Sequence, residues 1–229
     1  MYNYYIMILD ILLLISFLFS IYIGDLLLCS LFSNKARYYQ LHSLTNSVIL
    51  LDITPDLIDI FINPEYGYKL LNNHYASYLI LALHIYHVLS FNNLTFYDYF
   101  HHVLFVLSGV VPVIFYINYN QIYLGYLACS GLPGIIEYTT LALYKNNKLS
   151  LLKQKEILTN VYIYIRLPLC IFGVTMNYVA HINNYIHDNI YLTFYINFLL
   201  YLNGTLFTHL TIDSYYKYKY TQIKPRVFP

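Results

Sequence analysis

The stretch IMILDILLLISFLFSIYIGDLLLCSL, residues Ile6–Leu31, decides the class of fold. It is longer than the roughly 20 apolar residues that a helix needs to cross a bilayer. No basic segment precedes it, and it exceeds the apolar core of a secretory signal, which runs to about 15 residues. We therefore expect residues 1–34 to hold a first transmembrane helix that is not cleaved.

Six more apolar stretches follow, separated by short polar connections. They are Ser43–Ile62, Tyr75–Phe91, Tyr99–Tyr116, Ile122–Tyr144, Ile157–Val179 and Ile190–Leu210. The first of these six is the weakest span, because three aspartates and Pro55 interrupt it, and the next is short. The pattern predicts an all-α membrane protein, a bundle of about seven transmembrane helices, with six as the alternative.

The composition argues against a soluble globule of this size. Of the 229 residues, 59% are hydrophobic and 10% are charged, whereas soluble domains carry about 25% charged residues. The net charge of +1 gives no reason to expect a nucleic acid as partner. Membrane lipids are the partners that this composition indicates, and it specifies neither a cofactor nor an oligomeric state.

Basic residues divide unequally between the two sides of a seven-span arrangement. The side shared by the odd-numbered loops and the C-terminal residues carries Lys35, Arg37, Lys145, Lys148, Lys153, Lys155, Lys217, Lys219, Lys224 and Arg226. The other side carries Lys69, and Arg166 lies inside a span. Because basic loops favour the cytoplasmic side, the distribution predicts that residues 213–229 form a cytoplasmic tail.

Proline and glycine interrupt three of the expected spans. We expect Pro112 and Pro168 to kink their helices for packing. The run Gly131-Leu132-Pro133-Gly134 stands one turn before Glu137 in the fifth span. Since such breaks free backbone groups that need other partners, this run indicates an internal cavity.

Ionisable side chains gather at one level of the expected bundle. Inside a membrane they are costly, so they usually face the bundle interior and mark a site. Two histidines share one face of the third span at a spacing of three, and a second group opens the fourth span. We expect one chamber, open to the cytoplasm, lined by His84, His87, Asp98, His101, His102, Glu137 and Arg166.

Three interpretations of the histidines stay open. In the first, His101 or His102 is a general base or nucleophile, because imidazole titrates near neutral pH and Asp98 fixes its tautomer or stabilises its charge. In the second, the histidines hold one iron or zinc ion, although we assign no metal ligand. In the third, the polar groups satisfy one another and fix helix packing.

Glu137 and Arg166 are opposite charges at similar depth. One interpretation is an ion pair that sets the register of two helices. The other is an arginine kept for the phosphate or carboxylate of a lipid headgroup, which its planar guanidinium binds well.

Four segments, in order, resemble the TLC-domain family of membrane proteins. That family includes translocon-associated membrane proteins, ceramide synthases and lipid-regulating proteins of the endoplasmic reticulum. Its mark is a paired histidine that opens a membrane helix after an Asp-containing turn. The segments are LHSLTNSVILLDITPDLIDIFINP (Leu41–Pro64), LHIYHVLSFNNLTFYDYFHHVLFVLSG (Leu83–Gly109), SGLPGIIEYTTLALYK (Ser130–Lys145) and Arg166–Pro168.

The resemblance covers roughly residues 35–212 and implies a helical TLC-like membrane domain with a lipid cavity. In ceramide synthases the paired histidines are associated with acyl transfer from acyl-CoA, which corresponds to His101 and His102 here. The acidic segment that follows in those enzymes has no counterpart in this chain. The resemblance therefore implies lipid binding, sensing or acyl transfer, with acyl-CoA as a co-substrate and the endoplasmic reticulum as location.

Two other classes of function stay open. One is a non-catalytic membrane protein that assists lipid trafficking, membrane composition or protein insertion. The other is a transporter or channel, because Asp52, Asp56 and Asp59 form one acidic stripe that lines a watery groove or meets His42. No feature of the sequence connects this stripe to the paired histidines.

Overall fold

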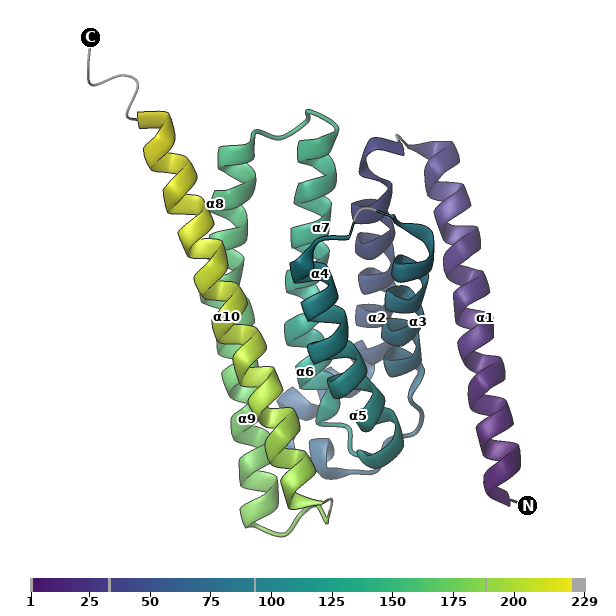
Figure 1. Ribbon diagram of the computed structural model, residues 1–229. Helices are drawn as coiled ribbons and strands as arrows, with labels where there is room; N and C mark the ends of the chain where they lie inside the picture. The colour runs from purple at the N-terminus through teal and green to yellow at the C-terminus, as the bar shows by residue number, and fades with distance from the viewer. Residues whose placement is uncertain (1, 33, 93, 188, 224–229) are drawn as a thin grey trace.

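The regular elements of the chain are helical throughout the described residues. The computed structural model describes residues 2–32, 34–92, 94–187 and 189–223 (Figure 1). Its α-helices are α1 (Tyr2–Leu31), α2 (Arg37–Ile62), α3 (Tyr75–Ser90), α4 (Phe96–His101), α5 (Val111–Tyr116), α6 (Ile122–Cys129), α7 (Leu132–Lys145), α8 (Leu151–Val161), α9 (Leu167–Ile182) and α10 (Ile190–Ile223). The all-α part of the prediction is confirmed.

Four shorter segments complete or link these helices. Two are 3₁₀ turns, η1 (Asn34–Ala36) and η2 (Pro64–Tyr68), and two are π-helical, η3 (His102–Val110) and η4 (Tyr162–Arg166). Because η3 joins α4 to α5 and η4 joins α8 to α9, each trio forms one rod. With α1, α2, α3, α10 and the broken pair α6–α7, the described residues form rods that run up and down the bundle (Figure 1).

Four described helices are long and apolar enough to cross a membrane. They are Ile8–Leu31, Phe96–Tyr116, Leu151–Ile182 and Ile190–Thr221. The apolar helix α3 is shorter, with 16 residues. Helix α2 and the pair α6–α7 are not among these four. Aspartates interrupt the apolar run of α2, and the break leaves α6 and α7 as two short helices.

The helices extend beyond several of the predicted spans. Helix α10 continues from the predicted end at Leu210 to Ile223, and α2 begins at Arg37, six residues before the predicted Ser43. Apolar length marks the part of a helix that suits a membrane, whereas hydrogen bonding decides where the helix ends. Most of the predicted tail is therefore helical as far as it is described, and residues 224–229 lie outside the described part.

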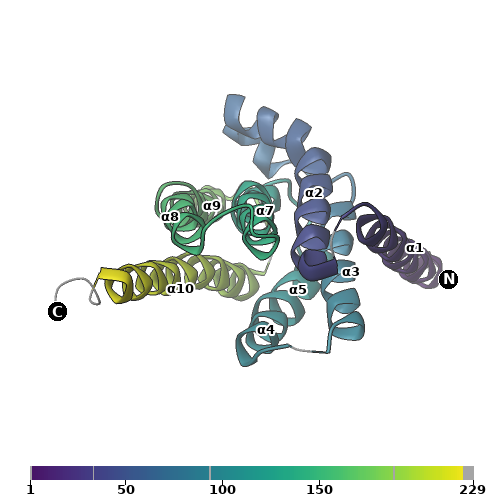
Figure 2. The ribbon, with the colours of Figure 1, turned by 90° about the horizontal axis from the view of Figure 1, so that it is seen from above.

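Buried apolar side chains gather where α2, α3 and α6 meet. Ile49, Ile53, Leu83 and Leu124 are almost completely buried there. Helix α2 stands between α7 on one side and α1 with α3 on the other (Figure 2). This central helix therefore links the two halves of the bundle.

An ion pair that the sequence did not reveal joins α1 to the bundle. The fully buried Asp25 accepts hydrogen bonds from Arg37 Nε, at 2.8 Å and 2.9 Å from its two oxygens, and from Arg37 Nη2. Tyr86 of α3 donates its hydroxyl hydrogen to Asp25 Oδ2 at 2.6 Å. One carboxylate therefore holds three helices together at the end of α1.

We expect Asp25→Asn to lower the free energy of unfolding by about 1–2 kcal/mol, because the amide keeps one acceptor oxygen but loses the charge-assisted bonds. Thermal unfolding followed by circular dichroism in detergent measures the change. Asp213→Asn is the control, because Asp213 pairs with Lys217 at the surface. Equal melting temperatures for Asp25→Asn and the unaltered chain would contradict a stabilising role of the Asp25 carboxylate.

The expected fifth span is broken at the Gly131–Gly134 run, where the sequence indicated an interruption. Helix α6 ends at Cys129 and α7 begins at Leu132. A Cβ atom on Gly131 would lie 2.9 Å from the carbonyl oxygen of Leu127, so only glycine allows the chain to turn this closely. The break faces a cavity, since Cys129 and Ser130 both line it.

Both π-helical segments end two residues before a proline. Proline has no N–H, and its ring clashes with the carbonyl four residues earlier in an α-helix. Before Pro112, the Val111 N–H bonds to Val106 O, and before Pro168 the Leu167 N–H bonds to Tyr162 O, a span of five residues in each case. The prolines that we expected to kink their helices are accommodated by wider turns, which are frequent at functional sites.

Candidate functional site: a long cavity with histidines at one end

An internal cavity of about 300 Å³ runs along the bundle. Ten elements supply its walls: α2, α3, α4, η3, α5, α6, α7, η4, α9 and α10. On α10 the lining extends from Thr193 to Phe207, fourteen residues or about 21 Å at 1.5 Å per residue. The volume is at the lower end of the range for ligand pockets.

The cavity differs in polarity along its length. The part nearest α4 is lined by Tyr38, His42, His84, Asp98, His101, His102, Glu137, Tyr138, Tyr162 and Arg166. We call this part the polar end. The middle is apolar and is lined by Phe105, Val106, Val110, Val113, Leu199 and Leu200.

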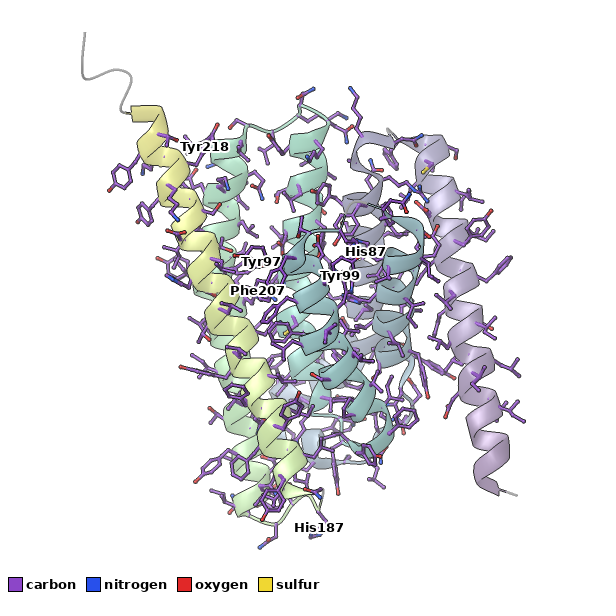
Figure 3. All side chains as sticks on the ribbon, in the orientation of Figure 1. His87, Tyr97, Tyr99, His187, Phe207 and Tyr218 are labelled. Carbon is purple, nitrogen blue, oxygen red and sulfur yellow. The ribbon has the colours of Figure 1, made fainter. Side chains whose placement is uncertain are left out.

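The mouth of the cavity lies at the start of α4. Tyr97 lines the cavity although its side chain is 62% exposed. Phe207 of α10 lines it too, and both side chains are labelled at a similar level in Figure 3. The polar end is therefore the part of the cavity that reaches the surface.

The structure gathers the seven predicted site residues in one region. Six of them line the cavity: His84, Asp98, His101, His102, Glu137 and Arg166. The seventh, His87, does not line it. It lies behind His102, with His87 Nδ1 3.0 Å from His102 Nε2. The structure thus brings six of the predicted residues to one cavity and places His87 behind them.

Hydrogen bonds fix the protonation of two histidines. His84 Nδ1 lies 2.7 Å from Ile80 O, and a carbonyl only accepts, so this nitrogen carries the proton. Neutral His84 then presents a lone pair on Nε2, which lies 3.3 Å from His101 Nε2. His101 Nε2 must donate, and neutral His101 keeps its lone pair on Nδ1. In this neutral form His101 can accept a proton at Nδ1.

Asp98 does not hold a histidine in the way we predicted. Its Oδ2 accepts hydrogen bonds from the backbone N–H and the hydroxyl of Thr95, each at 2.7 Å. Thr95 in turn caps α4, which makes a capping box. Among the described side chains no hydrogen bond links Asp98 to His101 or His102. Asp98 fixes the start of the helix that presents both histidines.

Glu137 and Arg166 belong to a network of four side chains. Tyr162 donates to Glu137 Oε2 and accepts from Arg166 Nη1 at 2.7 Å. Arg166 Nη2 donates to Asn203 Oδ1, and Arg166 Nη1 lies 3.9 Å from Glu137 Oε2. Arg166 is only 4% exposed, and its Nε has no hydrogen-bond partner among the described residues. The expected ion pair is thus largely bridged by a tyrosine.

Four residues of the polar end with aromatic rings were not predicted as site residues: Tyr38, His42, Tyr138 and Tyr162. The His42 ring lies 4.4 Å from both Tyr38 and Tyr138, measured between ring centroids. It also packs against His84 and His87. The sequence contained one signal for part of this group. Tyr38 and His42 are four residues apart at the start of α2, so they share one face of that helix.

The acidic stripe of α2 lies apart from the cavity. None of Asp52, Asp56 and Asp59 lines it, and Asp52 and Asp59 are exposed. His42 packs among the histidines at the polar end, so the predicted meeting of His42 with the stripe is wrong. The stripe gives a transport path through this cavity no support.

The arrangement of the histidines does not suit a metal. Within the described ranges, no three side chains of histidine, cysteine, aspartate or glutamate are placed to hold one ion. The imidazoles instead bond in two pairs, His84 with His101 and His87 with His102.

In the part of the chain that the structure describes, fold and site define a class of protein: a helical bundle with four helices long and apolar enough to cross a membrane, built around an amphipathic cavity. Comparisons of the chain with protein-family models, with curated proteins and with solved structures find no match.

Proposed function

We propose that this chain is a multi-pass integral membrane protein of the TLC-like group that binds an acyl lipid in its cavity. The observation that carries the proposal is the joining of a charged, imidazole-rich end to an apolar channel in one cavity. An acyl lipid likewise has a polar headgroup joined to an apolar chain. The walls that surround each part match its chemistry.

The outer surface supports the membrane part of the proposal. Large apolar side chains point outward along α1 and α10, among them Leu9, Phe19, Leu31, Phe194 and Phe198. Apolar faces of this extent need an apolar surrounding. We propose that all seven rods span the membrane, in the endoplasmic reticulum.

The distribution of charge supports a cytoplasmic C-terminus. The segments with the described basic residues of the loops, Lys35 to Arg37 and Lys145 to Lys155, lie at the same end of the bundle as the end of α10 (Figure 1). Lys69 is in the turn at the opposite end. An excess of basic residues marks the cytoplasmic side, so the mouth of the cavity faces the cytoplasmic leaflet.

The resemblance to TLC-domain proteins gains support from where its four segments lie. Each of them contributes to the cavity: His42 from the first, His101 from the second, Glu137 from the third and Arg166 from the fourth. Segments far apart in the sequence thus converge on one site.

Arg166 is the group best suited to an anionic headgroup. Its Nε lacks a partner within the described chain although the residue is buried, and an unpaired buried donor is costly. A phosphate or carboxylate at the polar end accepts hydrogen bonds from a guanidinium in good geometry. Asn203, which bonds to Arg166, is ten residues from Thr193 at the other end of the lining, or about 15 Å along α10. This length is about one leaflet of a hydrocarbon core that is about 30 Å thick, so it accommodates an acyl chain beyond the headgroup.

The same geometry supports acyl transfer from acyl-CoA. His101 Nδ1 accepts the proton of an acceptor hydroxyl or amine as its oxygen or nitrogen attacks the thioester carbonyl carbon. The C–S bond then breaks, and the proton passes to the departing CoA thiolate. The acyl product keeps its chain in the apolar part of the cavity.

Native mass spectrometry of the purified chain tests lipid binding. We expect an acyl lipid to copurify with the unaltered chain and to be lost from Gly125→Phe. Gly125 lines the cavity, and a Cβ there meets only ordinary contacts with Leu200, so a phenyl ring fills the apolar channel.

The matched control is Leu107→Phe, which adds a ring at an exposed position of η3. It is expected to keep the lipid. Equal lipid content in the unaltered chain and in Gly125→Phe, with both variants folded by circular dichroism, would contradict binding in this cavity.

A further inference from the structure

The end of the cavity opposite the histidines carries polar groups that the fold does not use. Gln121 is 3% exposed and Thr193 is 4% exposed, and both line the cavity. Gln121 Oε1 and Thr193 Oγ1 have no hydrogen-bond partner among the described residues. We call this part of the cavity the far end.

Neither Gln121 nor Thr193 makes the hydrogen bond to its own helix that such side chains commonly make. Serine and threonine hydroxyls in these helices commonly donate to the carbonyl four residues earlier, as Thr175 does to Ile171 and Thr205 to Tyr201. Thr193 makes no such bond. Gln121 precedes α6, yet its side chain does not cap that helix.

The protein closes the far end from outside. Gln121 N donates to Gly67 O at 2.9 Å, and Leu71 N donates to Asn118 O at 2.7 Å, so the turn after α2 lies across the loop before α6. His187, which Figure 3 labels near the start of α10, donates its backbone N–H to the Tyr119 hydroxyl oxygen at 3.3 Å. The two residues with unpaired atoms therefore line the cavity at an end that the loops close from outside.

We propose that the far end binds a polar group at the terminus of the acyl chain, so that the ligand class is a long-chain acyl lipid with a terminal hydroxyl. A hydroxyl donates to Gln121 Oε1 and accepts from Thr193 Oγ1, which satisfies both atoms at once. A methyl terminus leaves both unpaired. This inference rests on the proposed lipid binding and specifies the ligand of the same cavity.

The test compares two ligands on the full chain in lipid nanodiscs: hexadecanoic acid and its ω-hydroxy derivative. We expect the hydroxy acid to bind about tenfold more tightly, since one added hydrogen bond to a buried group is worth about one factor of ten. ω-Hydroxyoctanoic acid is expected to show no such advantage over octanoic acid, because its shorter chain leaves the hydroxyl in the apolar channel.

The double variant Gln121→Leu with Thr193→Val is expected to lose the preference or to favour hexadecanoic acid. The control is Thr175→Val, which removes a hydroxyl from an exposed helix position and should keep the preference. The comparison on the unaltered chain does not depend on how well these variants fold.

Equal affinity of the unaltered chain for both hexadecanoic acids would overturn the inference and would indicate that water serves the far end. The lipid-binding proposal would survive that result. Binding of neither acid would overturn the inference together with the proposed function.

Discussion

Glu137→Leu is expected to destabilise the protein by about 3 kcal/mol, because it leaves the buried charge of Arg166 without its counter-ion. Removing one partner of a buried pair costs more than losing the attraction, since the remaining charge stays out of water. The melting temperature should fall by roughly 10 °C. Circular dichroism of the purified chain in one detergent measures the change.

A second variant separates the charge from the packing. Glu137→Leu combined with Arg166→Met should recover most of the stability, because no uncompensated charge remains. The double variant is expected to lose binding of anionic lipids while it stays folded. Glu156→Leu serves as control, since Glu156 pairs with Lys153 at the surface and such pairs contribute little. A double variant as unstable as Glu137→Leu alone would contradict the buried-charge explanation.

His101→Gln is expected to reduce acyl transfer by roughly 100-fold, the loss typical for removing a general base. Glutamine still donates a hydrogen bond to His84 Nε2, so the cavity keeps its shape and the lipid stays bound. The assay follows transfer from acyl-CoA to a long-chain amine or alcohol in proteoliposomes. Replacing both His101 and His102 by alanine should abolish product formation.

The control is His74→Gln, at the opposite end of the bundle, where His74 Nε2 lies 3.1 Å from Asn118 Oδ1. This variant should transfer at the full rate. A full rate in the variant without His101 and His102 would contradict their catalytic role. Lipid binding without any turnover in the unaltered chain would contradict transfer and support the non-catalytic alternative.

The sequence predicted most of the fold because apolar length and helix breakers are local signals. The predicted start at Tyr75 and the predicted ends at Leu31, Ile62 and Tyr116 coincide with helix termini. The hydrogen bonds of Asp25 were not predicted, because its partners Arg37 and Tyr86 lie on two other helices and only the packing of the three helices brings them together. The helical continuation of α10 was missed because its residues are polar.

The sequence predicted which side chains lie close together but not how they bond to one another. The spacing of His84 and His87 placed them on one face, yet only His84 lines the cavity, because helix rotation is set by tertiary packing. The capping box of Thr95 and Asp98 is a local motif, and the sequence alone could have predicted it. The free far-end groups Gln121 and Thr193 carry no local signal.

Photo-crosslinking tests the central claim most directly: a lipid occupies the cavity, with its chain in the apolar channel. The purified chain is irradiated with a fatty acid that carries a diazirine in mid-chain, and the labelled peptides are mapped by mass spectrometry. We predict labels on cavity-facing residues such as Val110, Val113 and Leu199, which excess unlabelled acid removes. Labels confined to outward residues such as Leu9 and Leu107, with none in the cavity, would contradict the account.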